Sequence, residues 1–194
     1  MFFLIILIIN YNTGFCITIS LEFNMNIVLL GYMGCGKTTV GIRLSKLINK
    51  KFIDLDQFIE LTYNQKIQDI FLTRGEVYFR KIESECLNAL MLKYNNAVIS
   101  LGGGTVCYSN NLELINNSNS FYLKYSIPEL SQRLLKINST RPILSAIDDH
   151  DKMIDFVSKH LFERNYYYNQ ASKVIDCDLK DQDEIASEIL TVLS

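Results

Sequence analysis

The stretch Gly31-Tyr32-Met33-Gly34-Cys35-Gly36-Lys37-Thr38 has the pattern G-x-x-x-x-G-K-[ST] of a phosphate-binding loop. An apolar run at 27–30 precedes it, and an amphipathic segment that begins near Lys37 follows it. A phosphate-binding loop requires this strand-loop-helix setting. A glycine-rich turn that binds nothing would not need it, so the setting favours the phosphate-binding loop. Glycines let the backbone curl so that its amides, together with the helix N-terminus, bind phosphate oxygens. The sequence therefore predicts a nucleoside triphosphate site.

Two side chains of this loop have expected roles of their own. The ammonium group of Lys37 is expected to reach the β- and γ-phosphates of the nucleotide. The hydroxyl of Thr38 is expected to ligate Mg²⁺, a cation that prefers oxygen ligands. What the loop does not reveal is the molecule that accepts the phosphoryl group.

Composition and charge exclude several classes of protein. The chain has 194 residues, which suits one domain, and 48% of them are hydrophobic, enough for a sizeable core. Its net charge of −2 provides no basic surface for nucleic acid, so DNA and RNA are not expected partners. Its five cysteines form no C-x-x-C pair, so a reducing cytoplasm fits better than a disulfide framework or a zinc site. The two histidines, His150 and His160, are expected on the surface.

The first 24 residues differ from the rest of the chain. Residues 2–9 form an unbroken apolar run, which is shorter than the roughly 20 residues needed to span a bilayer. The run resembles a signal-peptide core but lacks the basic leading segment and the cleavage site. Met25 directly precedes the first expected strand, where translation could begin. We treat 1–24 as an apolar leader, expect no stable membrane association, and assign 25–194 to one domain.

Short apolar runs alternate with helical patterns along that domain, which indicates a parallel sheet with crossover helices. The expected strands are 26–31, 51–54, 97–101, 120–124 and 173–176. The fold class predicted from them is three-layer α/β with a central five-stranded parallel sheet. Apolar residues at helical spacing mark the inner faces of two helices, namely Gly41, Leu44, Leu47 and Ile48 in the first and Ile82, Cys86, Leu87, Leu90 and Met91 in a later one.

Ligands of an open parallel sheet gather beyond the carboxyl ends of its strands, and Asp54 and Asp56 follow the second expected strand. Two acids beside a phosphate loop can divide the work. One can help to hold the water shell of Mg²⁺ while the other faces the acceptor hydroxyl as orienting group or base. The alternative is that Asp56 only caps the following helix, and both roles can hold together.

Glycines and arginines mark the other loops at this edge. Gly102-Gly103-Gly104 follows the third strand and leaves backbone amides bare, so a substrate can lie against the chain, although a flexible turn is the alternative. Arg80, Arg141 and Arg164 lie outside any basic run. Each could bind a carboxylate or phosphate through two parallel hydrogen bonds, although a surface role is the simpler interpretation of any one alone.

Taken together, these motifs resemble those of the shikimate kinase family over about residues 26–194. The motifs, in the family's order and spacing, are G-Y-M-G-C-G-K-T-T at 31–39, F-I-D-L-D at 52–56, G-E-V-Y-F-R-K-I-E at 75–83, L-G-G-G at 101–104, R-P-I-L at 141–144 and E-R-N-Y-Y-Y at 163–168. The resemblance implies a P-loop kinase domain like that of nucleoside monophosphate kinases. It also implies phosphorylation of the 3-hydroxyl of shikimate by ATP with Mg²⁺, giving shikimate 3-phosphate on the route to chorismate and the aromatic amino acids.

The resemblance assigns residues to the ATP side of the site. Those implied to bind the phosphates are Gly34, Cys35, Gly36, Lys37, Thr38 and Thr39. Thr38 and Asp54 would serve Mg²⁺, and Arg141 would lie in a lid over ATP and share catalysis with Lys37. Arg133 stands where the family flanks the adenine.

On the acceptor side, the resemblance implies that Asp56 binds the ring hydroxyls and acts as the base. Arg80 and Arg164 would clamp the carboxylate of shikimate, and the amide of Gly103 would face the ring. The chain departs from the family at Cys35, where alanine or serine is more usual. It also departs at Asp178-Leu179-Lys180, where Arg or Pro often contacts adenine.

Three other functions compete with this interpretation. A related small-molecule kinase such as gluconate kinase would differ in the acceptor that it turns over. A GTP-dependent switch protein would carry an N-K-x-D motif and a D-x-x-G segment after a strand, and the chain has neither. A silent nucleotide-binding module would bind ATP without forming product. We expect a monomeric enzyme.

Overall fold

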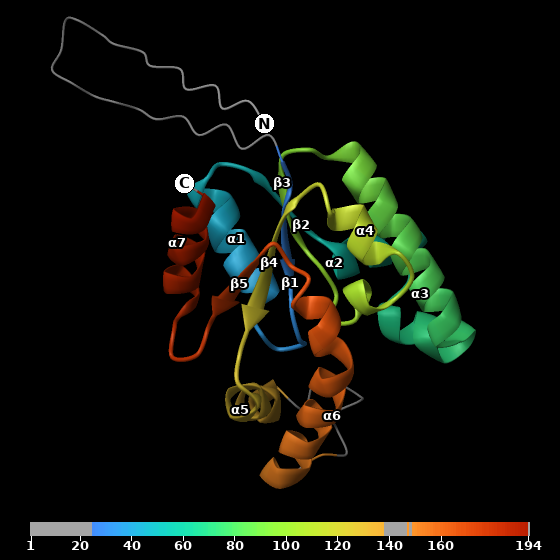
Figure 1. Cartoon of the computed structure of the whole chain (residues 1–194). Helices are drawn as coiled ribbons and strands as arrows, with labels where there is room; N and C mark the ends of the chain where they lie inside the picture. Colours follow the sequence, from blue (N-terminus) through green and yellow to red (C-terminus); the bar gives the residue numbers. More distant parts are fainter. Residues whose placement is uncertain (1–24, 138–146, 148, 194) are drawn as a thin grey trace, which may run out of the picture.

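The computed structural model describes residues 25–137, 147 and 149–193, whose helices surround one twisted sheet (Figure 1). The strands are β1 (Ile27–Leu30), β2 (Lys51–Asp54), β3 (Ala97–Ser100), β4 (Asn119–Lys124) and β5 (Lys173–Asp176). They lie in the order β2-β3-β1-β4-β5, and every neighbouring pair is parallel. The predicted five-stranded parallel sheet is therefore confirmed, and each predicted strand end agrees to within one residue.

Helices connect these strands and cover the sheet. They are α1 (Lys37–Leu47), α2 (Leu55–Tyr63), α3 (Ile67–Lys93), α4 (Asn111–Ile115), α5 (Ile127–Ile137), α6 (His150–Tyr168) and α7 (Gln182–Leu193), with a 3₁₀ turn, η1, at Thr105–Cys107. In Figure 1, α1 and α7 lie together on one face of the sheet and α3 and α4 on the other. Helices α5 and α6 lie at the end toward which β4 points, which is the carboxyl edge of the parallel sheet. None of the helices in the described ranges is long and apolar enough to cross a bilayer.

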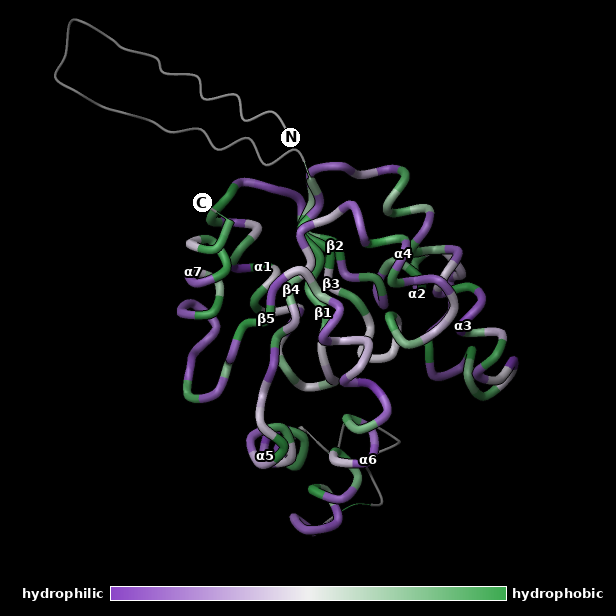
Figure 2. Tube along the Cα trace, viewed as in Figure 1, coloured by the Kyte–Doolittle hydropathy of each residue, from purple (hydrophilic) through white to green (hydrophobic). Residues whose placement is uncertain are grey.

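The middle of the sheet is apolar on both faces. All four residues of β1 and of β3 are buried, because each of these strands has neighbours on both sides and helices above and below. Figure 2 shows hydrophobic residues along these strands and hydrophilic ones on the outer helices. The rigid centre thus carries two of the loops that the sequence singled out, because the phosphate loop follows β1 and the glycine turn follows β3.

Packing corrects part of the predicted inner face of α1. Gly41 and Leu44 are buried as predicted, and Ile48 packs against the core. Leu47 is 58% exposed, so its predicted place on the inner face is wrong. The buried stripe centres on Gly41, Leu44 and the adjoining turn, and the helical repeat places Leu47 at its edge. The inner face predicted for the later helix is confirmed for Ile82, Cys86, Leu87 and Leu90, with Met91 partly buried.

We expect the substitution Gly41→Ala to destabilise the fold. An added Cβ would lie 2.4 Å from Cε2 of Phe52 on β2, and such overpacking costs about 1–3 kcal/mol. This cost opposes the gain in helix propensity of about 1 kcal/mol. Chemical denaturation should show a net loss of unfolding free energy, and adding Phe52→Leu should recover part of it. A more stable Gly41→Ala variant would show that α1 and β2 do not pack this closely.

Candidate active site

The phosphate loop joins β1 to α1 through glycines in unusual conformations. Gly31, Gly34 and Gly36 have φ values of 142°, 81° and 84°, a region that residues with side chains rarely adopt. At Gly31 an added Cβ would also lie 2.9 Å from the carbonyl oxygen of Leu123. Helix α1 begins directly after Gly36, so the segment predicted to bind phosphates occupies a helix N-terminus.

Within this loop, Lys37 folds back over the backbone. Its Nζ donates hydrogen bonds of 2.9 Å to the carbonyl oxygens of Gly31 and Tyr32, and lies 3.7 Å from Sγ of Cys35. The side chain of Cys35 belongs to the core, so this residue can offer a phosphate only its backbone. The loop therefore holds one positive charge, that of Lys37, at the N-terminus of α1.

Thr38 and Asp54 meet beside the loop. The hydroxyl of Thr38 donates a 2.7 Å hydrogen bond to Oδ2 of Asp54. The other carboxylate oxygen of Asp54 accepts from the backbone amides of Asp56 and Gln57, at 3.1 and 3.3 Å, and so caps α2. The predicted cap function of Asp56 is therefore wrong, because the neighbouring acid performs it.

The oxygens of Thr38 and Asp54 form a donor set that suits Mg²⁺, which prefers oxygen ligands and usually keeps several waters. Across 25–137 and 149–193 the side chains form no cluster of three or more His, Cys, Asp or Glu residues that could hold a metal ion alone. A magnesium ion at this place would accordingly rely on nucleotide phosphates and water as well, as it does in many kinases.

The glycine turn at 102–104 lies against three different parts of the site. An added Cβ at Gly102 would lie 2.9 Å from Oδ1 of Asp56, one at Gly103 would lie 3.1 Å from the amide of Met33, and one at Gly104 would lie 2.9 Å from Nη2 of Arg80. The bare backbone thus brings the acid, the phosphate loop and the arginine together. A flexible turn without contacts, the alternative reading of these glycines, does not describe it.

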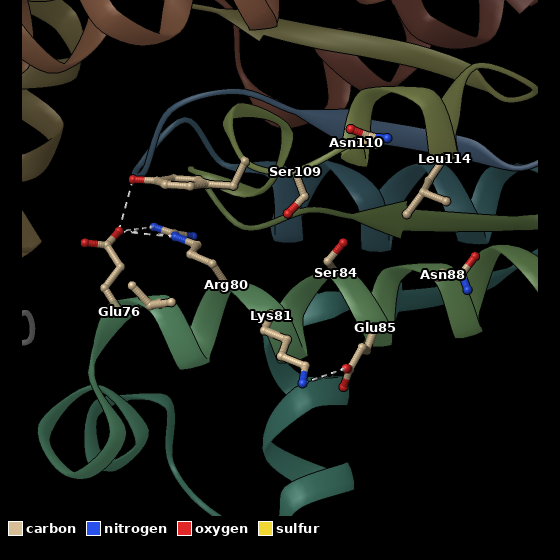
Figure 3. Close-up of a pocket in the computed structure, with 11 residues that line it drawn as sticks. Glu76, Arg80, Lys81, Ser84, Glu85, Asn88, Ser109, Asn110 and Leu114 are labelled. Atoms are coloured by element: carbon tan, nitrogen blue, oxygen red, sulfur yellow. Dashed lines mark hydrogen bonds and ion pairs between the residues drawn. The ribbon is translucent and has the colours of Figure 1, made fainter.

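Arg80 is held in place by two glutamates of its own helix. Nη1 donates to Glu83 at 2.9 Å, and Nε and Nη2 each donate to Glu76 at 3.2 Å. The guanidinium also lies 4.2 Å from the ring centroid of Tyr108. Figure 3 shows Glu76 and Arg80 joined at one end of a pocket of about 980 Å³ along α3. The site thus presents a guanidinium whose orientation is already fixed.

Glu83 is a site residue that the sequence interpretation missed. Its side chain is 1% exposed and accepts hydrogen bonds from Arg80 and from the hydroxyl of Thr105, the latter at 2.7 Å. A carboxylate on the apolar, buried side of α3 was the available signal, because a buried charge requires a partner. Gly75, with φ of 77°, breaks the helical geometry of α3 just before this segment.

Arg164, on α6, approaches the same region from another direction. Its guanidinium lies 5.7 Å from the ring centroid of Tyr32 in the phosphate loop. Burial raises the pKa of the Cys107 thiol in η1 to about 11, and the positive charges of Arg164 and Arg80 both oppose that rise. The two arginines that the sequence predicted as a pair therefore converge on η1 from different helices.

Arg133, which is predicted to flank the adenine, lies on α5. Arg133 donates to Glu129 at 2.8 Å and lies 4.2 Å from the ring centroid of Tyr125. An open pocket of about 490 Å³ lies beside it, with Glu129 and the segment 178–179 in its wall. Contact between Arg133 and adenine stays a prediction. Arg141 lies outside the described residues, and so does its predicted lid.

Comparisons with known proteins decide the family. A family model described as shikimate kinase matches residues 33–194. The chain belongs to the shikimate kinase family. The shikimate kinase of Flavobacterium johnsoniae is 45% identical over 170 residues, which cover 87% of this chain and 98% of the relative.

Solved shikimate kinases agree with the fold. The enzyme from Bacteroides thetaiotaomicron aligns with a TM-score of 0.79 at 35% identity, covering 87% of this chain and 96% of that one. The enzyme from Acinetobacter baumannii, in complex with shikimate, aligns with a TM-score of 0.78 at 30% identity, covering 90% and 96%. Shikimate kinases are ATP-dependent enzymes that use Mg²⁺, so membership confirms the predicted activity, fold and cofactors.

We expect Gly104→Ala to weaken acceptor binding without unfolding the protein. The backbone at Gly104 has φ of −113°, which alanine adopts freely, so the added Cβ should displace only the end of the Arg80 side chain. Steady-state kinetics should show KM for shikimate raised about tenfold, as for the loss of one charged hydrogen bond, with KM for ATP little changed. A thermal melt provides the control, and an unchanged KM would show that Arg80 does not need its position against the turn.

Proposed function

We propose that this chain transfers the γ-phosphoryl group of ATP to the 3-hydroxyl of shikimate at the site described above. The observation that carries the proposal is that Arg80 lies against Gly104 of the bare turn, while Arg80 and Arg164 both act on Cys107 of η1, which follows that turn. Two planar guanidiniums suit a carboxylate, which each can bind through two parallel hydrogen bonds. Membership of the shikimate kinase family supports the same acceptor.

On the phosphate side, the loop amides and the N-terminus of α1 bind the phosphates, and Lys37 exchanges its carbonyl partners for phosphate oxygens. Thr38 and Asp54 would hold Mg²⁺, which when bound would neutralise charge on the phosphates. The cationic group of Lys37 stabilises the charge that spreads over the transferring phosphoryl group. We assign to Arg141 the supply of a second positive charge at the transferring phosphoryl group, as the family resemblance implies.

On the acceptor side, the guanidiniums fix the ring through its carboxylate, and the Gly103 amide and Asp56 face the ring hydroxyls. The 3-hydroxyl oxygen forms a bond to the γ-phosphorus as the bond from that phosphorus to the bridging oxygen breaks. Asp56 receives the hydroxyl proton, and ADP leaves with the electron pair of the broken bond. Positioning and electrostatic stabilisation supply most of the catalysis in such transfers.

We also propose that the enzyme works as a monomer in the cytoplasm. Every residue assigned a role comes from one chain, so the site does not need a partner subunit. Cys35, Cys86, Cys107 and Cys177 are free thiols, a state that a reducing compartment maintains.

The carboxylate clamp predicts a specific loss in two variants. Arg80→Lys and Arg164→Lys keep the charge but lose the planar fork, so each should raise KM for shikimate about tenfold or more, with KM for ATP little changed. ADP release measured at varied shikimate tests this. Shikimate methyl ester, which lacks the anion, should be a poor substrate for the wild type and discriminate much less between wild type and variants. Equal use of ester and acid by the wild type would exclude the clamp, and turnover of gluconate in place of shikimate would favour the rival kinase.

Asp56 as the base predicts a defect in turnover. Asp56→Asn retains the size and polarity of the side chain but cannot accept the proton, so kcat should fall by about 10² or more. ATP binding, measured by calorimetry, should stay close to the wild-type value and show that the variant is folded. If only KM changes, Asp56 orients the substrate without acting as base.

A further inference from the structure

Helix α6, which carries Arg164, is attached to the rest of the site through three tyrosine hydroxyls. The hydrogen bonds join Tyr32 to Nδ1 of His160 at 2.8 Å, Tyr122 to Oδ1 of Asn165 at 3.3 Å, and Tyr168 to the carbonyl oxygen of Gly103. The first of these reaches the phosphate loop and the last reaches the glycine turn. Phenol hydrogen bonds thus link α6 to both loops, and of these three bonds only the first has a partner that titrates near neutral pH.

The direction of the hydrogen bond between Tyr32 and His160 depends on the tautomer of the imidazole. The Tyr32 side chain is 1% exposed, and burial raises the pKa of its phenol far above the usual value, so the hydroxyl stays protonated. A protonated hydroxyl can donate or accept, and we assign it as the donor and Nδ1 of His160 as the acceptor. This requires an imidazole that is neutral and carries its proton on Nε2. A buried hydroxyl without this acceptor would be costly.

The surroundings of His160 favour the neutral imidazole. Burial lowers its pKa, the positive charge of Arg164 lowers it further, and Glu163 opposes them more weakly. The ring also packs against Phe156, with ring centroids 4.2 Å apart, and against Tyr32 of the phosphate loop. The expectation that His160 lies on the surface holds only in part, because the residue is half-buried and one face of α6 turns it toward the phosphate loop.

We infer that His160 is a positioning residue: by accepting the hydrogen bond of Tyr32 it fixes the aromatic ring on which the Arg164 guanidinium lies, and it does so only while the imidazole is neutral. The geometry that carries this inference is the sequence of contacts from Nδ1 to the phenol at 2.8 Å and from the phenol ring to the guanidinium at 5.7 Å. The inference rests on the proposed function, in which Arg164 binds the carboxylate of shikimate.

The sign of the pH effect follows from the contacts. As the pH falls, protonation turns Nδ1 from an acceptor into a donor and adds a second positive charge beside Arg164. The phenol proton then loses its acceptor, the hydroxyl must rotate to accept from Nδ1, and the ring beside the guanidinium is no longer held as before. Because the pKa of His160 is lowered by folding, the bond is fully formed above the unfolded pKa and is lost as pH falls through the folded one. KM for shikimate should therefore rise on the acid side.

The test compares six variants with the full-length wild type by measuring kcat and both KM values from about pH 5.5 to about pH 8.5, the range over which a histidine titrates. His160→Leu and Tyr32→Phe remove the bond, so each should show, at every pH, a KM for shikimate about fivefold above the wild-type value at neutral pH, and the double variant should go no higher. His160→Asn keeps an acceptor that cannot be protonated. It should recover most of the wild-type KM and lose the acid-side rise.

Tyr122→Phe is the matched control, because it removes a hydroxyl bond to the same helix from a partner, Asn165, that does not titrate. It should keep the wild-type shape of the pH profile. Three results would overturn the inference. The first is an acid-side rise in KM that persists in His160→Asn, and the second is a rise that Tyr122→Phe abolishes as well. The third is an unchanged KM in both His160→Leu and Tyr32→Phe. Arg164→Lys serves as the benchmark: if that variant also leaves KM unchanged, the carboxylate clamp of the proposed function is wrong.

Discussion

The bare backbone at Gly102–Gly104 is the constraint on which the site depends. Strand β3 lies beside β1 in the parallel register, so the turn after β3 must meet the phosphate loop after β1. With no side chains in the way, the turn touches Asp56, Met33 and Arg80 at once. A larger residue at any of these positions would push apart the groups that must meet around one small acceptor.

Ion pairs and charged hydrogen bonds also fix the orientation of the side chains in the site. Glu83 is buried and holds the Arg80 guanidinium, while Asp54 uses one oxygen to cap α2 and the other to meet Thr38. Breaking a buried pair leaves an uncompensated charge, which is far more costly than losing a surface ion pair. The arrangement therefore keeps a few polar side chains in fixed orientations at the edge of an apolar sheet, as positioning catalysis requires.

The features predictable from the sequence are those set by local pattern. The strands follow from short apolar runs, and the phosphate loop, the acids and the glycine turn follow from their places after those strands. The features that the sequence did not predict depend on tertiary contacts. They are the capping of α2 by Asp54, the place of Leu47 at the edge of the buried stripe, and the orientation of Glu83 and His160 toward the site. Such facts require knowing which helix faces which loop, and a periodic pattern does not specify that.

The most direct measurement is a crystal structure of this chain with shikimate and ADP bound together. We expect the carboxylate of shikimate between the guanidiniums of Arg80 and Arg164, the ring against the turn at 102–104, and the 3-hydroxyl within hydrogen-bond reach of Asp56 and directed at the phosphate loop. A carboxylate bound away from both arginines, or a 3-hydroxyl turned away from the loop, would contradict this assignment of the site.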